Sequence, residues 1–412
     1  MLSCGEKTGS SVSSKTKMKN PESVLVIINA VLTAALSFAF LYATVSFLGL
    51  ADRGKIAFLQ SLSITLTNLM RLGLHQQAQV LSTPDAQIYV RRLVVTQSVY
   101  LASFTFLAFL GLNHLSTTSG LIPPSLHPMT MPLYAGSLLF YSNCSFLVQL
   151  TSSARNNLAQ ICVYYSALFV VLFSFERSTS VNVDCVFAAL IIANSLGALI
   201  CLFALRIRPS LRLKLGDVPS QMRGGLKIFG WSNLKDLMYR IDILILPSLL
   251  DAKSYGHYTI ITNLAQSSWR VIDPLLGYYN RLLTLGGLNF RAEMKFKMSR
   301  KVKVAALGLF IVLAAFLTLI ASKITLETDA NIVFLTFVFC LATASVSIWK
   351  KISIDELAQG RHVFMYKSIS AFLFIYLILS QLVNDISSAL ILASALMVSL
   401  SLWAWRLDTI RK

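Results

Sequence analysis

Charged residues are scarce in this chain. Asp, Glu, Lys and Arg together make up 13% of its 412 residues, whereas soluble proteins carry roughly a quarter. Hydrophobic residues make up 55%. So little charge excludes an ordinary soluble domain and indicates a membrane protein, in which lipid contacts most of the surface.

The motifs of enzymes and metalloproteins are also missing. The six cysteines form no CxxC pair, and the five histidines are scattered without ligand spacing, so the sequence predicts no metal site and no cofactor. No nucleophile motif and no Gly-rich phosphate loop is present. Residues 113–130, the longest loop expected outside, contain no Lys, Arg, Asp or Glu. We therefore expect a protein that is not an enzyme.

Apolar runs of about 20 residues, long enough to cross a bilayer, recur along the chain. We expect an all-α polytopic membrane protein with about twelve transmembrane helices. The expected spans are 23–48, 55–74, 90–112, 131–153, 157–175, 182–205, 226–250, 258–283, 303–322, 331–349, 363–383 and 386–405. The seventh and eighth contain ionisable residues, which leaves open whether they are continuous helices.

Lys and Arg are unevenly distributed between the loops. With a cytoplasmic N-terminus, 27 of the 36 fall on the inner side, and five (Arg53, Lys55, Arg177, Lys253 and Lys323) fall on the outer side. This asymmetry predicts that both termini are cytoplasmic. It also explains the net charge of +18 without nucleic-acid binding. Trp349, beside Lys350 and Lys351, is expected to anchor the inner interface.

The two halves of the chain resemble each other. Gly54 and Gly256 occupy matching outer turns 202 residues apart, and Arg155 and Arg361 match at 206. Both offsets are near half of the chain and predict two six-helix bundles around a central cavity. Chance recurrence of Gly and Arg in turns is the alternative. The expected parts are a disordered tail (1–20), the N-terminal bundle (21–205), a basic cytoplasmic linker (206–225) and the C-terminal bundle (226–412).

One stretch of the second half is similar to a known family. Residues 232–246 contain an Arg240-x-Asp242 pair followed by an apolar run, and Gly256-x-Tyr258 follows after a short turn. Residues 47–73 and 356–361 resemble the first hairpin and a later inner turn of the same family. The chain thus resembles the polysaccharide or O-antigen flippases of the multidrug/oligosaccharidyl-lipid/polysaccharide exporter superfamily, which carry lipid-linked oligosaccharides.

The resemblance implies a cavity that opens alternately to each side of the bacterial inner membrane. The implied substrate is a polyprenyl pyrophosphate carrying a short oligosaccharide, such as an O-antigen repeat unit for lipopolysaccharide. Besides membrane lipid, a polysaccharide polymerase and a chain-length regulator are the candidate partners. Two alternatives stay open. A drug exporter of the same superfamily should have a more acidic and aromatic site, and a membrane-embedded polysaccharide polymerase should have a large external loop.

Cations inside the expected spans are the first candidate site residues. A charge at a helix centre costs about 2.5–3.5 kcal/mol on insertion scales, so it should face water or a partner. Lys235, Arg240 and Arg270 are expected to line the cavity and bind pyrophosphate, because the planar guanidinium can engage two phosphate oxygens.

Acidic residues accompany these cations at helical spacing. Asp236 lies four residues before Arg240, Asp242 lies two after it, and Asp273 lies three after Arg270. We expect these acids either to form structural ion pairs or to couple transport to an ion gradient. Pro274 should break or kink its helix.

A polar stripe runs along the first span. Asn29, Thr33 and Ser37 recur at intervals of four residues, with Thr44 further along. The stripe predicts either a cavity lining that binds sugar hydroxyls or a surface for packing against another helix.

The loop asymmetry generates a first testable prediction. Green fluorescent protein fused after Lys412 should be fluorescent, and alkaline phosphatase fused there should be inactive, because the C-terminus is expected to stay in the cytoplasm. Fusions within residues 113–130 should behave in the opposite way. An active phosphatase at the C-terminus would refute this topology.

Overall fold

The computed structural model describes residues 21–71, 95–111, 126–151, 153–178, 181–205, 230, 233–285, 300–325, 329–358 and 362–410. The described chain is built from helices alone, as expected. The main elements are α1 (Pro21–Met70), a helix at Val95–Gly111, α4 (Thr130–Thr151), α5 (Ala154–Ser178), α6 (Val183–Leu205), α8 (Ile241–Ile245), η2 (Leu246–Ser248), α9 (Ala252–Leu285), α11 (Arg300–Thr325), α12 (Ala330–Ala358), α13 (His362–Leu379), η3 (Ser380–Leu382) and α14 (Ile386–Ile410). Within the described residues, each of the twelve expected spans contains helical structure.

The long helix α1 consists of two limbs separated at Gly49. This residue has a φ of +78°, a conformation that glycine adopts readily because it has no Cβ. Ala43 and Ile56, at similar distances on either side of Gly49, are buried in the same hydrophobic cluster. The two limbs therefore form a hairpin, and Gly49 is the turn of the first two expected spans.

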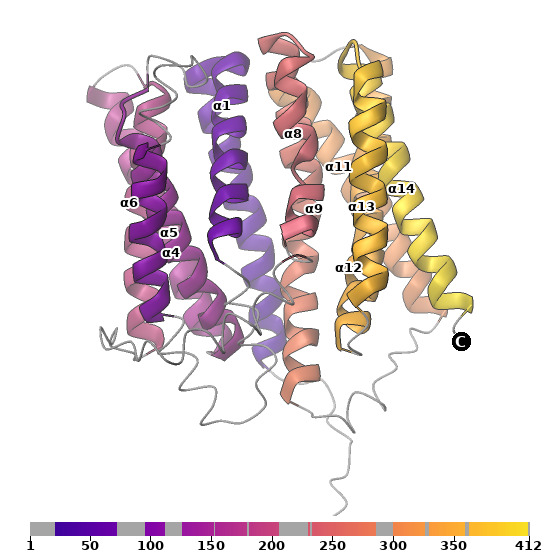
Figure 1. Ribbon diagram of the computed structural model, residues 1–412, viewed down its shortest axis with the longest axis horizontal. Helices are drawn as coiled ribbons and strands as arrows, with labels where there is room; N and C mark the ends of the chain where they lie inside the picture. Colours follow the sequence, from indigo (N-terminus) through magenta and orange to yellow (C-terminus); the bar gives the residue numbers. More distant parts are fainter. Residues whose placement is uncertain are drawn as a thin grey trace, which may run out of the picture.

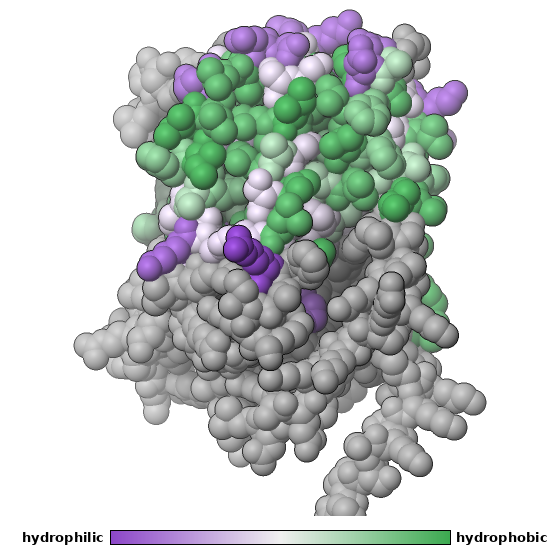
Figure 2. Space-filling model, turned by 90° about the vertical axis from the view of Figure 1, so that its right-hand side faces the viewer, coloured by the Kyte–Doolittle hydropathy of each residue, from purple (hydrophilic) through white to green (hydrophobic). Residues whose placement is uncertain are grey.

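The surface of the described helices is apolar over a broad area. Five helices are long and apolar enough to cross a membrane, judged by length and composition within the described residues. Large hydrophobic side chains are exposed, among them Phe203 (77%), Leu382 (69%) and Val312 (67%). Figure 2 shows a hydrophobic band beneath a hydrophilic rim on the side of the C-terminal helices. Such a surface is compatible with lipid as solvent, and the chain is a multi-pass membrane protein.

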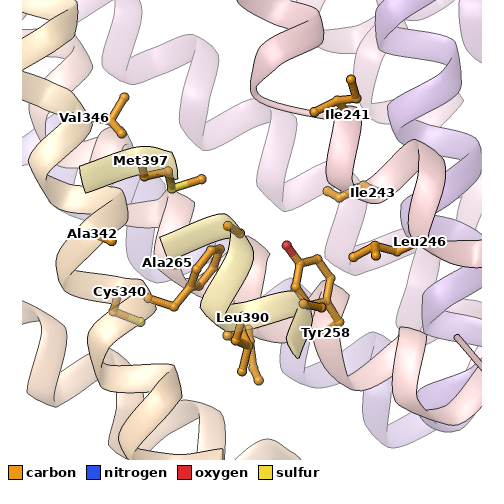
Figure 3. Close-up of a cluster of buried hydrophobic side chains, with 14 of the residues drawn as sticks. Ile241, Ile243, Leu246, Tyr258, Ala265, Cys340, Ala342, Val346, Leu390 and Met397 are labelled. Carbon is orange, nitrogen blue, oxygen red and sulfur yellow. The ribbon is translucent and has the colours of Figure 1, made fainter. Parts of the chain in front are cut away.

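The helices form two groups that stand side by side (Figure 1). One group contains α1 and α4 to α6, with a core that includes Phe187, Leu168 and Leu172. The other contains α8, α9 and α11 to α14, and Figure 3 shows side chains from α8, α9, α12 and α14 meeting in its core. Helix α1 lies next to α8 and α9, so these elements form the boundary between the groups.

The two glycines matched by the internal repeat meet at this boundary. A Cβ at Gly54 would lie 3.0 Å from the Tyr255 ring and 3.1 Å from the Cα of Gly256, and a Cβ at Gly256 would clash with the Leu50 carbonyl. Residues close to a two-fold axis contact their own equivalents, and the Gly54–Gly256 contact is compatible with such an axis. The expected tail (1–20) and linker (206–225) lie outside the described residues.

The seventh and eighth spans differ in continuity. The seventh is interrupted, because a turn at Tyr239 and Arg240 separates the helix over 233–238 from α8. The eighth is the continuous helix α9, which runs through Pro274 to Leu285. Of the expected break or kink at Pro274, the break is therefore wrong, and a kink stays a prediction. Proline removes one hydrogen-bond donor, a loss that membrane helices tolerate when neighbouring groups compensate.

The glycine contact generates a second prediction. Gly256→Ala should lower the free energy of unfolding by about 1–3 kcal/mol, because the added methyl group must displace the backbone of α1. Thermal unfolding of the purified protein in detergent micelles measures this change. Gly111→Ala is the matched control, since a Cβ at Gly111 meets no atom within 4 Å. Equal melting temperatures for the two variants would contradict the close contact.

Candidate functional site

The interruption of the seventh span is the centre of the candidate site. Arg240 has φ −132° and ψ −3°, outside the α-helical region. The Tyr239 carbonyl, released from the helix, accepts a hydrogen bond from Gln266 Nε2 on α9 at 3.0 Å. Non-helical backbone at membrane depth is tolerated only where protein or a water-filled cavity surrounds it. The break therefore marks a position that is not exposed to lipid.

Charged side chains at this break and just before it contact the second limb of α1. Arg240 Nη1 donates to Ser61 Oγ at 3.4 Å, and Asn68 Nδ2 donates to Asp236 Oδ2 at 2.8 Å. Both members of the expected Asp236–Arg240 pair thus contact the other group of helices. Lys235, one residue before Asp236, is half-buried.

Two further guanidinium groups lie on the same limb of α1. Arg53 is buried, with 3% of its surface exposed, and is close enough to Tyr134 and Tyr255 to interact with them electrostatically. Arg71, at the end of the limb, donates to Ser142 on α4. The expectation that Arg53 lies in an outer loop was wrong, because the turn at Gly49 puts it inside the second limb.

The sequence spacing of these residues could have predicted that they share one face of the helix. On a helix of 3.6 residues per turn, residues 53, 61, 68 and 71 fall within about 80° of one another. These positions carry Arg, Ser, Asn and Arg, so one face of an apolar helix is polar along its length. The polar stripe expected from the sequence covered the first limb only and missed this second one.

Asp242 is buried in the C-terminal group, with 5% of its surface exposed. Its carboxylate accepts hydrogen bonds from the Tyr258 hydroxyl at 2.8 Å and from the Ile243 backbone N–H at 2.8 Å. The Tyr255 hydroxyl donates to the Ile243 carbonyl at 2.8 Å. Two tyrosines of α9 therefore hold the start of α8. Figure 3 shows Tyr258 near Ile243 and Leu246 of this segment.

An aromatic cluster with a lysine lies behind the break. The Tyr239 ring is 4.7 Å from that of Trp269 and 6.3 Å from that of Trp349. Lys350 Nζ lies 4.1 Å from the Trp269 ring centroid and 5.0 Å from that of Tyr239. We call these four residues the aromatic clamp. Trp349 is 1% exposed, so its expected role as an interface anchor was wrong, because α12 turns this side chain into the core.

The polar stripe of the first limb of α1 faces α5. Asn29 Nδ2 donates to the Ala154 carbonyl at 2.9 Å, and Ser37 Oγ lies 2.5 Å from the Tyr165 hydroxyl. Thr33 Oγ1 donates to the Asn29 carbonyl within its own helix at 2.7 Å. These contacts lie inside the N-terminal group and favour the packing interpretation of the stripe.

The remaining predicted site residues lie on α9. Arg270 and Asp273 follow Trp269, whose indole N–H donates to the Thr343 carbonyl on α12 at 2.7 Å. Their side chains are outside the described residues. Among the residues that the structure describes, no group of three or more His, Cys, Asp or Glu side chains is arranged to hold a metal ion.

Comparisons by sequence found no counterpart, since neither a family model nor a curated protein matches the chain. Solved structures are similar. A mutant of the Vibrio cholerae MATE transporter VcmN is 12% identical, with a TM-score of 0.64 over 95% of each chain. A MOP superfamily transporter from Pyrococcus furiosus is 12% identical, with a TM-score of 0.62 over 95% of each chain. The MATE transporter ClbM, solved with Rb⁺, is 15% identical, with a TM-score of 0.60 over 94% of this chain and 92% of that one. At these identities the likeness establishes the fold: the chain has the fold of MATE transporters.

The buried carboxylate generates a third prediction. Tyr258→Phe should lower the free energy of unfolding by about 1–3 kcal/mol, because the buried Asp242 loses a hydrogen-bond donor. Thermal unfolding in detergent micelles measures the effect. Tyr42→Phe removes the same hydroxyl from a side chain that is 61% exposed and should change little. A Tyr258→Phe protein as stable as the Tyr42→Phe control would refute the contact.

Proposed function

We propose that this protein moves a polyprenyl-pyrophosphate-linked oligosaccharide across the bacterial inner membrane by alternating access. The observation that carries the proposal is the position of Arg240. Its guanidinium lies at a helix break on the boundary between the two groups of helices and contacts Ser61 of the opposite group. Discontinuous helices at the boundary between repeats form the substrate sites of many transporters.

The chemistry of this boundary suits a phosphorylated substrate. Arg53 and Arg71 lie near the two ends of the second limb, on the same face as Ser61, which Arg240 contacts between them. A guanidinium can donate two parallel hydrogen bonds to phosphate oxygens. A pyrophosphate has several such oxygens and more than one negative charge. Several guanidinium groups would therefore bind it more tightly than one would.

Contacts along the boundary provide the means of alternating access. The Gly54–Gly256 contact joins the groups near the Gly49 turn, and the Asn68–Asp236 hydrogen bond joins them near the opposite end of the limb. In our proposal these two contacts open in turn, so that the substrate reaches the guanidinium groups from one side at a time. Asp242, buried next to the break, is the candidate for coupling this movement to an ion gradient.

A drug exporter of the same superfamily is the alternative, and the fold is equally compatible with it. The Pyrococcus furiosus protein is described as having a binding pocket of reversed polarity that suggests a different function. The polarity of the site, and not the fold, must therefore decide between the two. Here the boundary carries guanidinium groups, which favours an anionic substrate.

The cellular setting follows from the same proposal. A lipid-linked oligosaccharide is assembled on the cytoplasmic face and used on the outer face. The protein would therefore act between the enzymes that build the repeat unit and a polysaccharide polymerase with its chain-length regulator. These partners and the inner-membrane location are parts of the proposal.

The proposed role of the cations generates a fourth prediction. Arg240→Ala and Arg270→Ala should each lower polysaccharide export about 10- to 100-fold, the effect of losing a charged hydrogen bond of about 1.5–3 kcal/mol. The measurement is surface polysaccharide in a deletion strain that carries each variant at wild-type protein level. Lipid-linked repeat units should accumulate on the cytoplasmic face.

Arg155→Ala is the matched control, because Arg155 is exposed at the start of α5 and should leave export unchanged. Normal export by both site variants would refute the pyrophosphate site. A deletion strain with normal polysaccharide but increased drug sensitivity would favour the exporter alternative. A strain in which single repeat units still reach the outer face would indicate a polymerase.

A further inference from the structure

The direction of the Arg240 side chain is not fixed by helix geometry. The residue lies between the helix over 233–238 and α8, with φ −132° and ψ −3°. Within a helix, the backbone hydrogen bonds would determine where the side chain points. At a break, the direction depends on the contacts that hold the neighbouring residues, and Tyr239 is the residue immediately before.

Tyr239 is held through both its ring and its backbone. Its ring packs against Trp269 at 4.7 Å and Trp349 at 6.3 Å. Its carbonyl accepts the hydrogen bond from Gln266 Nε2 at 3.0 Å. The position of the break is therefore tied to α9, which carries Gln266 and Trp269, and to α12, which carries Trp349.

Lys350 is the charged member of the aromatic clamp. Its ammonium lies 4.1 Å from the Trp269 centroid and 5.0 Å from the Tyr239 centroid, so one cation attracts both rings. The Trp269 indole N–H donates to the Thr343 carbonyl, two helical turns before Lys350 on α12. Lys350 thus contacts the face of the Trp269 ring, and Thr343 binds its edge. The Tyr239 ring packs against Trp269 and is held in place with it.

We propose that Lys350 is a positioning residue for Arg240. By attracting the rings of Tyr239 and Trp269, it holds the helix break in the geometry that directs the guanidinium towards Ser61 and the boundary between the groups. The inference rests on the proposed function, in which Arg240 binds pyrophosphate. Lys350 acts through the break and does not contact the substrate.

The test compares affinities for farnesyl pyrophosphate, a short prenyl pyrophosphate, by isothermal titration calorimetry of the full-length protein in lipid nanodiscs. Lys350→Met removes the charge and keeps a long unbranched side chain, and it should weaken binding about tenfold. Lys350→Arg keeps a cation that stacks on aromatic rings and should bind nearly as tightly as wild type. Lys367→Met, which removes an exposed cation on α13, is the control and should bind as wild type does.

A double-mutant cycle separates positioning from direct contact. If Lys350 acts through Arg240, Lys350→Met should weaken binding no further when Arg240→Ala is already present. A full additional loss would mean that Lys350 contacts the anion itself, and it would overturn the inference. Unchanged affinity of the single variant would overturn it as well.

Two outcomes distinguish the inference from the function on which it rests. A wild-type protein that does not bind farnesyl pyrophosphate would overturn the proposed function, and the positioning role with it. Tight wild-type binding that Lys350→Met leaves intact would overturn the positioning role alone. Lys350→Gln, which also lacks the charge, should give the same loss and replaces Lys350→Met should that protein not fold.

Discussion

The second limb of α1 lies against the seventh and eighth spans over most of its length, and this contact sets the geometry between the two groups of helices. Near the Gly49 turn the helices approach closely, because neither Gly54 nor Gly256 has a side chain. Further along the contact becomes polar, through Arg240 with Ser61 and Asn68 with Asp236. A close approach at one end thus brings the charged residues of one group within reach of the other.

Polar groups around the break are placed where another helix can satisfy them. In lipid an unpaired backbone or side-chain group is costly, and the break at Tyr239 would expose several. Gln266 binds the released carbonyl, Tyr258 binds Asp242, and Tyr255 binds the Ile243 carbonyl. All three donors come from α9, so this unbroken helix supports the broken one. The same contacts hold the residues next to Arg240, whose φ and ψ lie outside helical geometry.

Much of the fold could be predicted because the solvent constrains it. A bilayer requires apolar helices of fixed length, so composition and spacing located all twelve spans. The candidate site was predicted less completely. Arg240, Asp236 and Asp242 were identified because charge is conspicuous inside an apolar run, and the structure places all three at the break. Arg53 and Lys350 were expected in loops, and both lie inside helices. Arg53 does so because the turn comes earlier, at Gly49. Lys350 does so because α12 continues beyond its apolar part to Ala358.

The amino-acid sequence by itself determined the class of the protein, the positions of its helices and the residues whose charge needs a partner. These properties follow from transfer energies and helix periodicity, which are local. Only the tertiary structure decided that the seventh span is interrupted and the eighth is not, that Asn29 and Ser37 bind α5, and that Lys350 packs on Tyr239 and Trp269. Each of these depends on contacts between helices that are distant in the sequence, and no local sequence pattern specifies such contacts.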